Sequence, residues 1–243
     1  MTVVLKLGGS VITDKQRPET LDEGNLARAA AAVADYDGEI VLVHGGGSFG
    51  HHHASEHGIT SETGSHDVTG ALAVHDAMGR LNDAVLAALH ERDVPALPVQ
   101  PLSAAARDGD GMLSLSTTQV KTMLAEGFVP TVQADIIAHS GAGVTVVSGD
   151  ELVVELATQL HADRVGLCAG VPGVFGSDGE VIGHIESFAA VREALGGSDA
   201  TDVTGGMSAK VRALLELDVP ASIFGLDGLE DFFDGDSPGT RVG

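Results

Sequence analysis

Apolar and polar positions along the chain predict short strands that alternate with amphipathic helices. Residues 2–7 and 39–43 are apolar runs rich in β-branched side chains, which is typical of buried strands. Both runs end in glycines. Similar apolar runs predict five further strands, at 94–99, 128–132, 143–147, 164–168 and 222–225.

The segments between these runs carry apolar residues at helical spacing. Val74, Met78, Leu81 and Val85 recur every three or four residues and predict a long amphipathic helix over 68–92. Thr20 and Glu23 have the spacing of a capping box ahead of another helical stripe, and Asp150 can cap a third helix. Further helices are predicted over 117–126 and from Met207 to Leu217. Alternation of strand and helix along the chain predicts an α/β fold with a largely parallel central sheet and helices on both faces.

Three glycine loops stand where strands end or helices begin. The loop Gly45-Gly46-Gly47 follows the strand at 39–43, and Lys6-Leu-Gly-Gly-Ser10 closes the first strand. The third is Thr204-Gly-Gly-Met-Ser-Ala-Lys210. Glycine lets backbone N–H groups approach an anionic ligand closely, although each loop alone could be a simple tight turn. The polar segment 51–67 is expected to be a mobile surface element near these loops.

The charge of the chain is strongly negative and makes its few lysines informative. With 35 Asp and Glu against 13 Lys and Arg, the formal charge is −22, which disfavours nucleic acid and anionic membranes as partners. An acidic surface with little lysine is typical of proteins adapted to concentrated salt, where charge repulsion is screened. Only four lysines occur, and three lie in or just after glycine loops: Lys6, Lys15 and Lys210. Such lysines are expected to meet phosphate.

Other features narrow the class of protein. Cys168 is the only cysteine, so the chain can form neither an internal disulfide nor a cysteine-based zinc site. No apolar run approaches the roughly 18 residues of a membrane span, and the N-terminus lacks a secretory signal, so we expect a cytoplasmic protein.

Three common nucleotide-binding patterns do not describe the chain. No Gly-Lys pair occurs, which excludes a P-loop, and the protein-kinase motifs are missing. Gly45, Gly47 and Gly50 match the dinucleotide pattern G-x-G-x-x-G, but a histidine-rich segment follows in place of a strand that ends in an acid.

Four motifs in order resemble those of the amino acid kinase superfamily. They are Lys6-Leu-Gly-Gly-Ser10, His44-Gly-Gly-Gly, Ser148-Gly-Asp-Glu-Leu-Val-Val-Glu-Leu156 and Asp202-Val-Thr-Gly-Gly-Met-Ser-Ala-Lys210. Within it, Thr13-Asp-Lys15 and Ser48-Phe-Gly-His51 are similar to archaeal isopentenyl phosphate kinases. The resemblance implies an open αβα sandwich, commonly a homodimer, that transfers the ATP γ-phosphoryl group to isopentenyl phosphate with Mg²⁺.

The same resemblance implies roles for individual residues. Lys6, Lys15 and His51 would serve catalysis, with Lys15 near the transferred group. The ATP side would comprise Lys6, Gly8, Gly9, Ser10, Gly47, Asp150, Gly206 and Lys210. The acceptor side would comprise Gly46, Gly47, Gly50, His51 and Gly149, and no residue is assigned as a metal ligand. The chain 1–243 would form one domain, with acceptor binding in about 1–140 and nucleotide binding in about 141–243.

The chain departs from the family pattern at two places, and other functions stay open. Ala169-Gly-Val-Pro-Gly-Val-Phe175 replaces an acidic run near the nucleotide base, and His52 and His53 follow His51 where a proline is common. A fosfomycin-type or other small phosphate or phosphonate kinase is an alternative, and a carboxylate kinase is a weaker one. An alternative of another class is a non-catalytic metal or nucleotide binder built on His51, His52, His53, His57 and His66.

Overall fold

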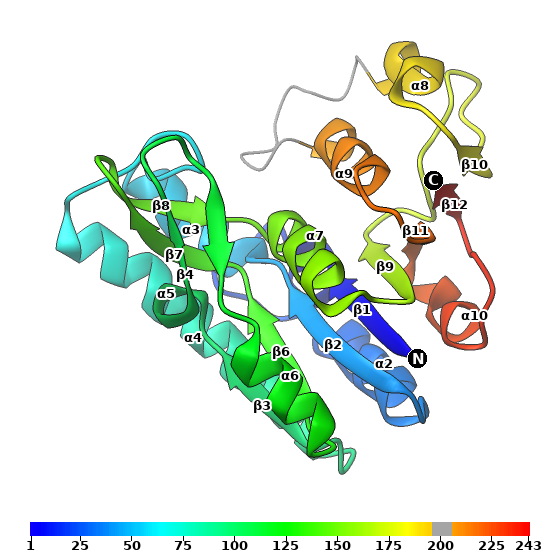
Figure 1. Cartoon of the computed structure of the whole chain (residues 1–243), viewed down its shortest axis with the longest axis horizontal. Coiled ribbons are helices and arrows are strands. Elements are labelled where there is room, and N and C mark those ends of the chain that lie inside the picture. Colours follow the sequence, from blue (N-terminus) through cyan, green and yellow to red (C-terminus); the bar gives the residue numbers. More distant parts are fainter. Residues whose placement is uncertain (196–205) are drawn as a thin grey trace.

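A large central sheet organises the molecule (Figure 1). The computed structural model describes residues 1–195 and 206–243. Within them, eight strands lie in the order β10-β12-β11-β9-β1-β2-β6-β3. β1 (Thr2–Leu7) lies in the middle, with β2 (Glu39–His44) and β9 (Arg164–Ala169) as parallel neighbours. The other strands of this sheet are β3 (Ala96–Val99), β6 (Val129–Gln133), β10 (His184–Ile185), β11 (Ala221–Gly225) and β12 (Thr240–Val242).

The direction of the strands agrees with the sequence prediction. The strands from β11 to β3 are parallel to one another. β12 is antiparallel to β11, and β10 is parallel to β12, so these two edge strands run opposite to the rest. The predicted strands of this sheet match to within two residues at each end. β10 and β12, of two and three residues, were not predicted, because strands so short carry little hydrophobic pattern.

Helices cover both faces of this sheet and divide the core in two. One core joins Val3, Leu5 and Leu7 of β1 to α1, α2, α3, α4 and α10. The other joins Val4 to α6, α7, α8 and α9. Successive side chains of a strand point to opposite faces, so Lys6 shares the face of Val4 and points toward α7. The bounds of the helices not described below are α1 (Gly9–Ile12), α5 (Pro101–Ala104), α6 (Thr118–Ala125), α8 (Phe188–Leu195), α9 (Gly206–Leu215), η1 (Leu226–Gly228) and α10 (Leu229–Phe233).

A second, four-stranded sheet was not predicted. Its order is β5-β4-β7-β8, with β4 (Ala105–Arg107), β5 (Leu113–Leu115), β7 (Asp135–His139) and β8 (Gly143–Val147). The strand predicted at 143–147 is therefore real but lies outside the central sheet, antiparallel to β7. β7 follows β6 after Ala134 alone, and an apolar run does not reveal which sheet it joins.

Two predicted helix caps are wrong in detail. The cap of α2 (Glu23–Ala34) is Asp22, whose carboxylate accepts from the backbone N–H of Asn25, and not Thr20. The cap of α7 (Gly149–Leu160) is Ser148, which forms a capping box with Glu151. Asp150 is thereby released from capping and lies inside the molecule.

The polar segment after the second glycine loop begins as a helix, contrary to the expectation of a mobile surface element. α3 (Gly47–Glu56) buries Phe49 and Ala54 and packs against α4 (Val68–His90), the predicted long helix. Residues further along pair with β8, where Ser65 bridges to Val144. The apolar positions of α3 are too few for the sequence to show a helical stripe. In the part of the chain that the structure describes, no helix is long and apolar enough to cross a membrane.

The contact between the first two glycine loops provides a test of the fold. A Cβ atom on Gly9 would lie 2.1 Å from the backbone nitrogen of Gly47, and neither backbone can move aside. We expect Gly9→Ala to lower the free energy of unfolding by about 1–3 kcal/mol, as overpacking does. Chemical denaturation in concentrated KCl measures this change.

Gly79 in the middle of α4 is the matched control. A Cβ there meets nothing within 4 Å, so Gly79→Ala should raise the free energy of unfolding by about 0.5–1 kcal/mol. Wild-type stability of the Gly9→Ala variant would show that the two loops do not touch as described.

Candidate active site

The loops at the carboxyl ends of three neighbouring central strands meet. The N–H of Gly8, after β1, donates to the carbonyl of Cys168 in β9 at 2.8 Å, and the N–H of Gly45, after β2, donates to the carbonyl of Leu7 at 3.0 Å. Gly170, after β9, lies against Ser10. Ligands of open parallel sheets bind at this edge, so the predicted Gly8, Gly9 and Ser10 stand where a ligand is expected.

Gly47 begins α3 in a conformation that favours glycine. Its φ is +49°, and an added Cβ would lie 2.1 Å from the hydroxyl oxygen of Thr13. That hydroxyl accepts from the N–H of Ser48 at 3.0 Å and donates to the carbonyl of Gly9 at 2.6 Å. Thr13 thus ties the first loop to the first turn of α3. The resemblance did not assign a role to this residue.

One buried carboxylate joins the two lysines predicted for the nucleotide side. Asp150 Oδ1 lies 2.6 Å from Nζ of Lys6, and Asp150 Oδ2 lies 3.3 Å from Nζ of Lys210. Their side chains are 10%, 8% and 17% exposed, respectively. Gly149, the preceding residue, leaves room for the Lys6 stem, since a Cβ there would lie 2.8 Å from Lys6 Cε. β1, α7 and α9 therefore each contribute one charged group to a single cluster.

The two ammonium groups keep Asp150 ionised. Burial alone would raise the pKa of its carboxyl, but the charges and hydrogen bonds of Lys6 and Lys210 outweigh burial and hold the pKa below its ordinary value. Counted over the described residues, the cluster carries two positive charges and one negative charge. A net positive charge in a strongly acidic protein is suited to attract phosphate oxygens.

Apart from Gly149, which begins α7, the predicted acceptor residues lie on or beside the first turns of α3. Gly46 precedes this helix, and Gly50 packs against Met78 of α4, whose sulfur would lie 2.7 Å from a Cβ on Gly50. His51 is half-buried and follows Gly47 by four residues, so both share one face of the helix. Because Gly47 touches Gly9, this face of α3 borders the first glycine loop.

Lys15 and Gly206 occupy the margins of the site. Lys15 is exposed on the loop after α1 and, with Ser10, lines a cleft of about 580 Å³. Gly206 begins α9, and its carbonyl lies 3.5 Å from Nζ of Lys210. Asp202, Thr204 and Gly205 of the fourth motif lie outside the described residues.

His44 of the second motif is a structural residue in this arrangement. Its ring is fully buried, with Nε2 3.0 Å from Asn82 Oδ1 and Nδ1 3.3 Å from the carbonyl of Gly45. Burial holds the pKa of His44 below its ordinary value, so the ring stays neutral. Burial also raises the pKa of Cys168 to about 12, which excludes a reactive thiolate there.

A His–Asp pair escaped the sequence analysis. His75 Nδ1 on α4 lies 2.8 Å from Asp135 Oδ2 at the start of β7, and Gln133 donates to the same oxygen at 3.0 Å. Burial raises the pKa of Asp135 despite these partners. The two residues are 60 positions apart, so their spacing in the sequence gives no sign of the pair. Only knowledge of how α4 packs against β7 could have indicated it.

The five histidines of the alternative metal-binding hypothesis do not form one cluster in the structure. His52 and His53 group with Glu56, and this is the one such group among the residues that the structure describes. His57 lies instead beside Asp67, and His66 is exposed on the loop before α4.

The Asp150 cluster leads to a pH-dependent prediction. Asp150→Asn removes the charge between two ammonium groups and should lower the free energy of unfolding at neutral pH by about 3–5 kcal/mol. Because the folded pKa of Asp150 is depressed, its contribution is fully present above its unfolded pKa, about 3.9, and is lost as the pH falls through the folded pKa.

The difference between wild type and Asp150→Asn should therefore shrink below about pH 4, as measured by chemical denaturation across the pH range. Asp110→Asn is the matched control, because Asp110 is exposed in the turn between β4 and β5 and should have little effect. A constant difference down to low pH would show that the Asp150 charge does not stabilise the cluster.

Comparisons with known proteins agree with this geometry. The model of the amino acid kinase family matches residues 1–217. The isopentenyl phosphate kinase of Haloferax volcanii is 64% identical over 99% of this chain and 98% of its own. The isopentenyl phosphate kinase of Methanocaldococcus jannaschii is 34% identical over 87% of this chain and 85% of its own. An X-ray structure of isopentenyl phosphate kinase superposes with a TM-score of 0.86 and 29% identity, covering all of both chains. The superfamily and fold expected from the four motifs are confirmed, and the chain belongs to the amino acid kinase family.

Proposed function

We propose that this protein transfers the γ-phosphoryl group of ATP to isopentenyl phosphate and so makes isopentenyl diphosphate for isoprenoid biosynthesis. The observation that carries the proposal is the cluster in which Lys6 and Lys210 flank Asp150, next to two glycine loops in backbone contact. The Haloferax volcanii relative, which bears the name isopentenyl phosphate kinase, supports the choice of acceptor.

The chemistry of a phosphate acceptor suits these residues. A phosphate monoester has a second pKa near 6 and is already a dianion at neutral pH, so its oxygen attacks without a general base. The obstacle is repulsion between two anions that must approach in line, and the transition state spreads negative charge over the equatorial oxygens. Ammonium groups and backbone N–H groups fixed in advance offset this charge.

We assign the two sides of the reaction to different elements. The acceptor phosphate would bind at the N-terminus of α3, beside Gly46, Gly47 and Gly50, where the helix dipole favours an anion. The N–H of Gly50 already donates to the carbonyl of Gly46 at 2.9 Å, so Gly50 would allow close approach of the phosphate without donating to it. His51 would donate a hydrogen bond to it, and Gly149 would border the same space.

ATP would lie across the edge of the sheet. Its phosphates would contact Lys6, Gly8, Gly9, Ser10 and Gly47, with Asp150, Gly206 and Lys210 on the nucleotide side. Lys15 would approach the transferred group. Acceptor binding would then belong mainly to about 1–140 and nucleotide binding to about 141–243.

We propose that Mg²⁺ binds together with ATP. Asp150 is engaged by two ammonium groups, so it does not offer a free carboxylate to a metal. The described residues therefore do not form a carboxylate cage for Mg²⁺ beside the glycine loops, and the ion would be held by phosphate oxygens and water, as is usual for Mg²⁺.

Three further proposals concern the setting of the enzyme. We propose that it works in the cytoplasm, where ATP is available, and that it forms a homodimer, as its family commonly does. The formal charge of −22 supports a working environment of concentrated salt, which screens self-repulsion.

Turnover with different acceptors tests the proposed reaction. In multimolar KCl with ATP and Mg²⁺, we expect kcat/KM for isopentenyl phosphate to exceed that for fosfomycin, UMP and glutamate by at least 100-fold. Release of ADP measures the rate with each acceptor. Preference for fosfomycin would favour the alternative phosphonate kinase, and equal rates would contradict the proposed acceptor.

Replacement of His51 tests its proposed contact with the acceptor phosphate. His51→Ala removes one donor to a charged group and should lower kcat by about 100- to 1,000-fold, as loss of an oxyanion donor does. Steady-state kinetics on folded protein measure the loss.

His161→Asn is the matched control. His161 caps the C-terminal end of α7 with a φ of +51°, a conformation that Asn tolerates. The His161→Asn variant should therefore have wild-type activity. A near-normal rate for His51→Ala would remove His51 from the site.

A further inference from the structure

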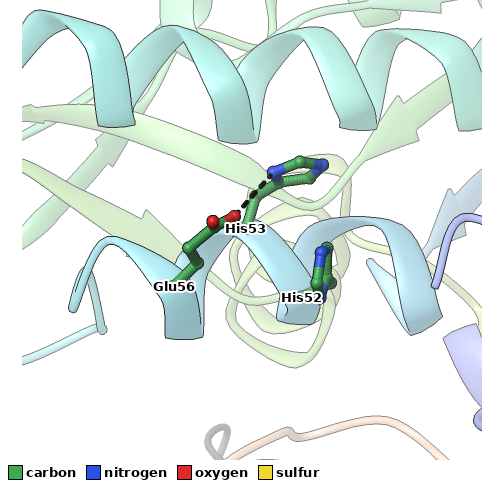
Figure 2. A group of neighbouring side chains, drawn as sticks. All are labelled: His52, His53 and Glu56. Atoms are coloured by element: carbon green, nitrogen blue, oxygen red, sulfur yellow. Dashed lines mark ion pairs between the residues drawn. The ribbon is translucent and has the colours of Figure 1, made fainter.

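Three potential metal ligands converge on one side of α3, where His52 and Glu56 are exposed and His53 is partly buried (Figure 2). The ligand atoms of His52, His53 and Glu56 lie within 4.8 Å of one another. His52 and Glu56 are four residues apart, and His53 and Glu56 are three apart, so helical geometry brings them together. The two rings meet edge to face, with centroids 5.0 Å apart. None of these residues belongs to the proposed reaction.

A neighbouring carboxylate fixes the orientation of the His53 ring. Nε2 of His53 lies 2.5 Å from Glu19 Oε1, and the guanidinium of Arg80 donates to both oxygens of the same carboxylate, at 2.7 and 3.2 Å. A carboxylate accepts hydrogen bonds, so Nε2 of His53 carries the proton and donates it. In the neutral ring the lone pair is then on Nδ1.

Nδ1 of His53 is directed toward Glu56 (Figure 2). The atom is buried and lacks a hydrogen-bond partner among the described residues, and it lies 3.8 Å from Glu56 Oε2. An unpartnered buried nitrogen is costly unless a further group satisfies it. A histidine that binds metal through one nitrogen while the other donates to a carboxylate is a recurrent arrangement of metal sites.

The distances and the donor types indicate the class of metal. Ligands bound at about 2.0–2.1 Å to a tetrahedral Zn²⁺ lie about 3.4 Å apart, so a shift of a few tenths of an ångström would let His53 and Glu56 share an ion. Two imidazoles and one carboxylate suit zinc-class ions, whereas Mg²⁺ and Ca²⁺ favour oxygen ligands. We propose that His52, His53 and Glu56 form a surface site for a zinc-class divalent cation, with water completing its coordination.

An ion bound at this site would stabilise the fold. A bound ion would link adjacent turns of α3, and the His53–Glu19 contact would extend that link to the loop carrying Lys15. An ion that binds only the folded protein stabilises it by mass action, so thermal stability should rise with zinc concentration.

Calorimetric titration of Zn²⁺ into the tag-free protein tests the site. The titration is done without nucleotide, which would chelate the metal, and its readout does not depend on the proposed kinase activity. We expect one Zn²⁺ per chain, at least tenfold weaker binding in His52→Ala and Glu56→Gln, and a 10- to 100-fold loss in Glu19→Gln through its orienting role. His66→Ala, which removes an exposed histidine outside the cluster, should bind as the wild type does.

Wild-type affinity in both His52→Ala and Glu56→Gln, or no stoichiometric binding by the wild type, would overturn the proposal. Loading the wild-type protein with Co²⁺ supplies a second measurement that needs no variant. Visible absorption bands of protein-bound Co²⁺ that Zn²⁺ displaces would support the site, and their absence would contradict it.

Discussion

The candidate site depends on one carboxylate held between two ammonium groups. Lys6, Asp150 and Lys210 come from β1, α7 and α9, which are far apart in the sequence, and each is largely removed from water. Two buried cations alone would repel each other and destabilise the fold. Asp150 offsets the repulsion between the two lysines, and among the described residues the three side chains together keep one net positive charge. Stability and the proposed anion binding therefore rest on the same interaction.

The parallel sheet explains why these groups meet. Parallel strands place all their carboxyl ends at one edge, where β1, β2 and β9 deliver their loops side by side. The alternation of side chains along β1 then determines which residues enter each core. Leu5 and Leu7 enter one core, and Lys6 points to the opposite face, where α7 supplies its counterion.

Much of this arrangement could be predicted from the sequence. Short apolar runs showed the parallel strands, the spacing of Val74, Met78 and Leu81 showed α4, and the placement of scarce lysines in glycine loops indicated an anion site. The ion pairs could not be predicted, because a sequence shows that Asp150 can cap a helix but not that Ser148 already does. The second sheet and the His75–Asp135 pair depend on contacts between distant segments, and such contacts leave no local periodicity.

The backbone contact between Gly9 and Gly47 fixes the separation between the first glycine loop and α3. The loop proposed for the nucleotide and the helix proposed for the acceptor touch without room for a single methyl group, so neither can slide along the other. Under the proposed function, a change in the size of the acceptor would have to be accommodated by the side chains around these two turns, while the turns themselves stay unchanged. Relatives with very different acceptors are accordingly expected to diverge in their helices before they diverge in these two turns.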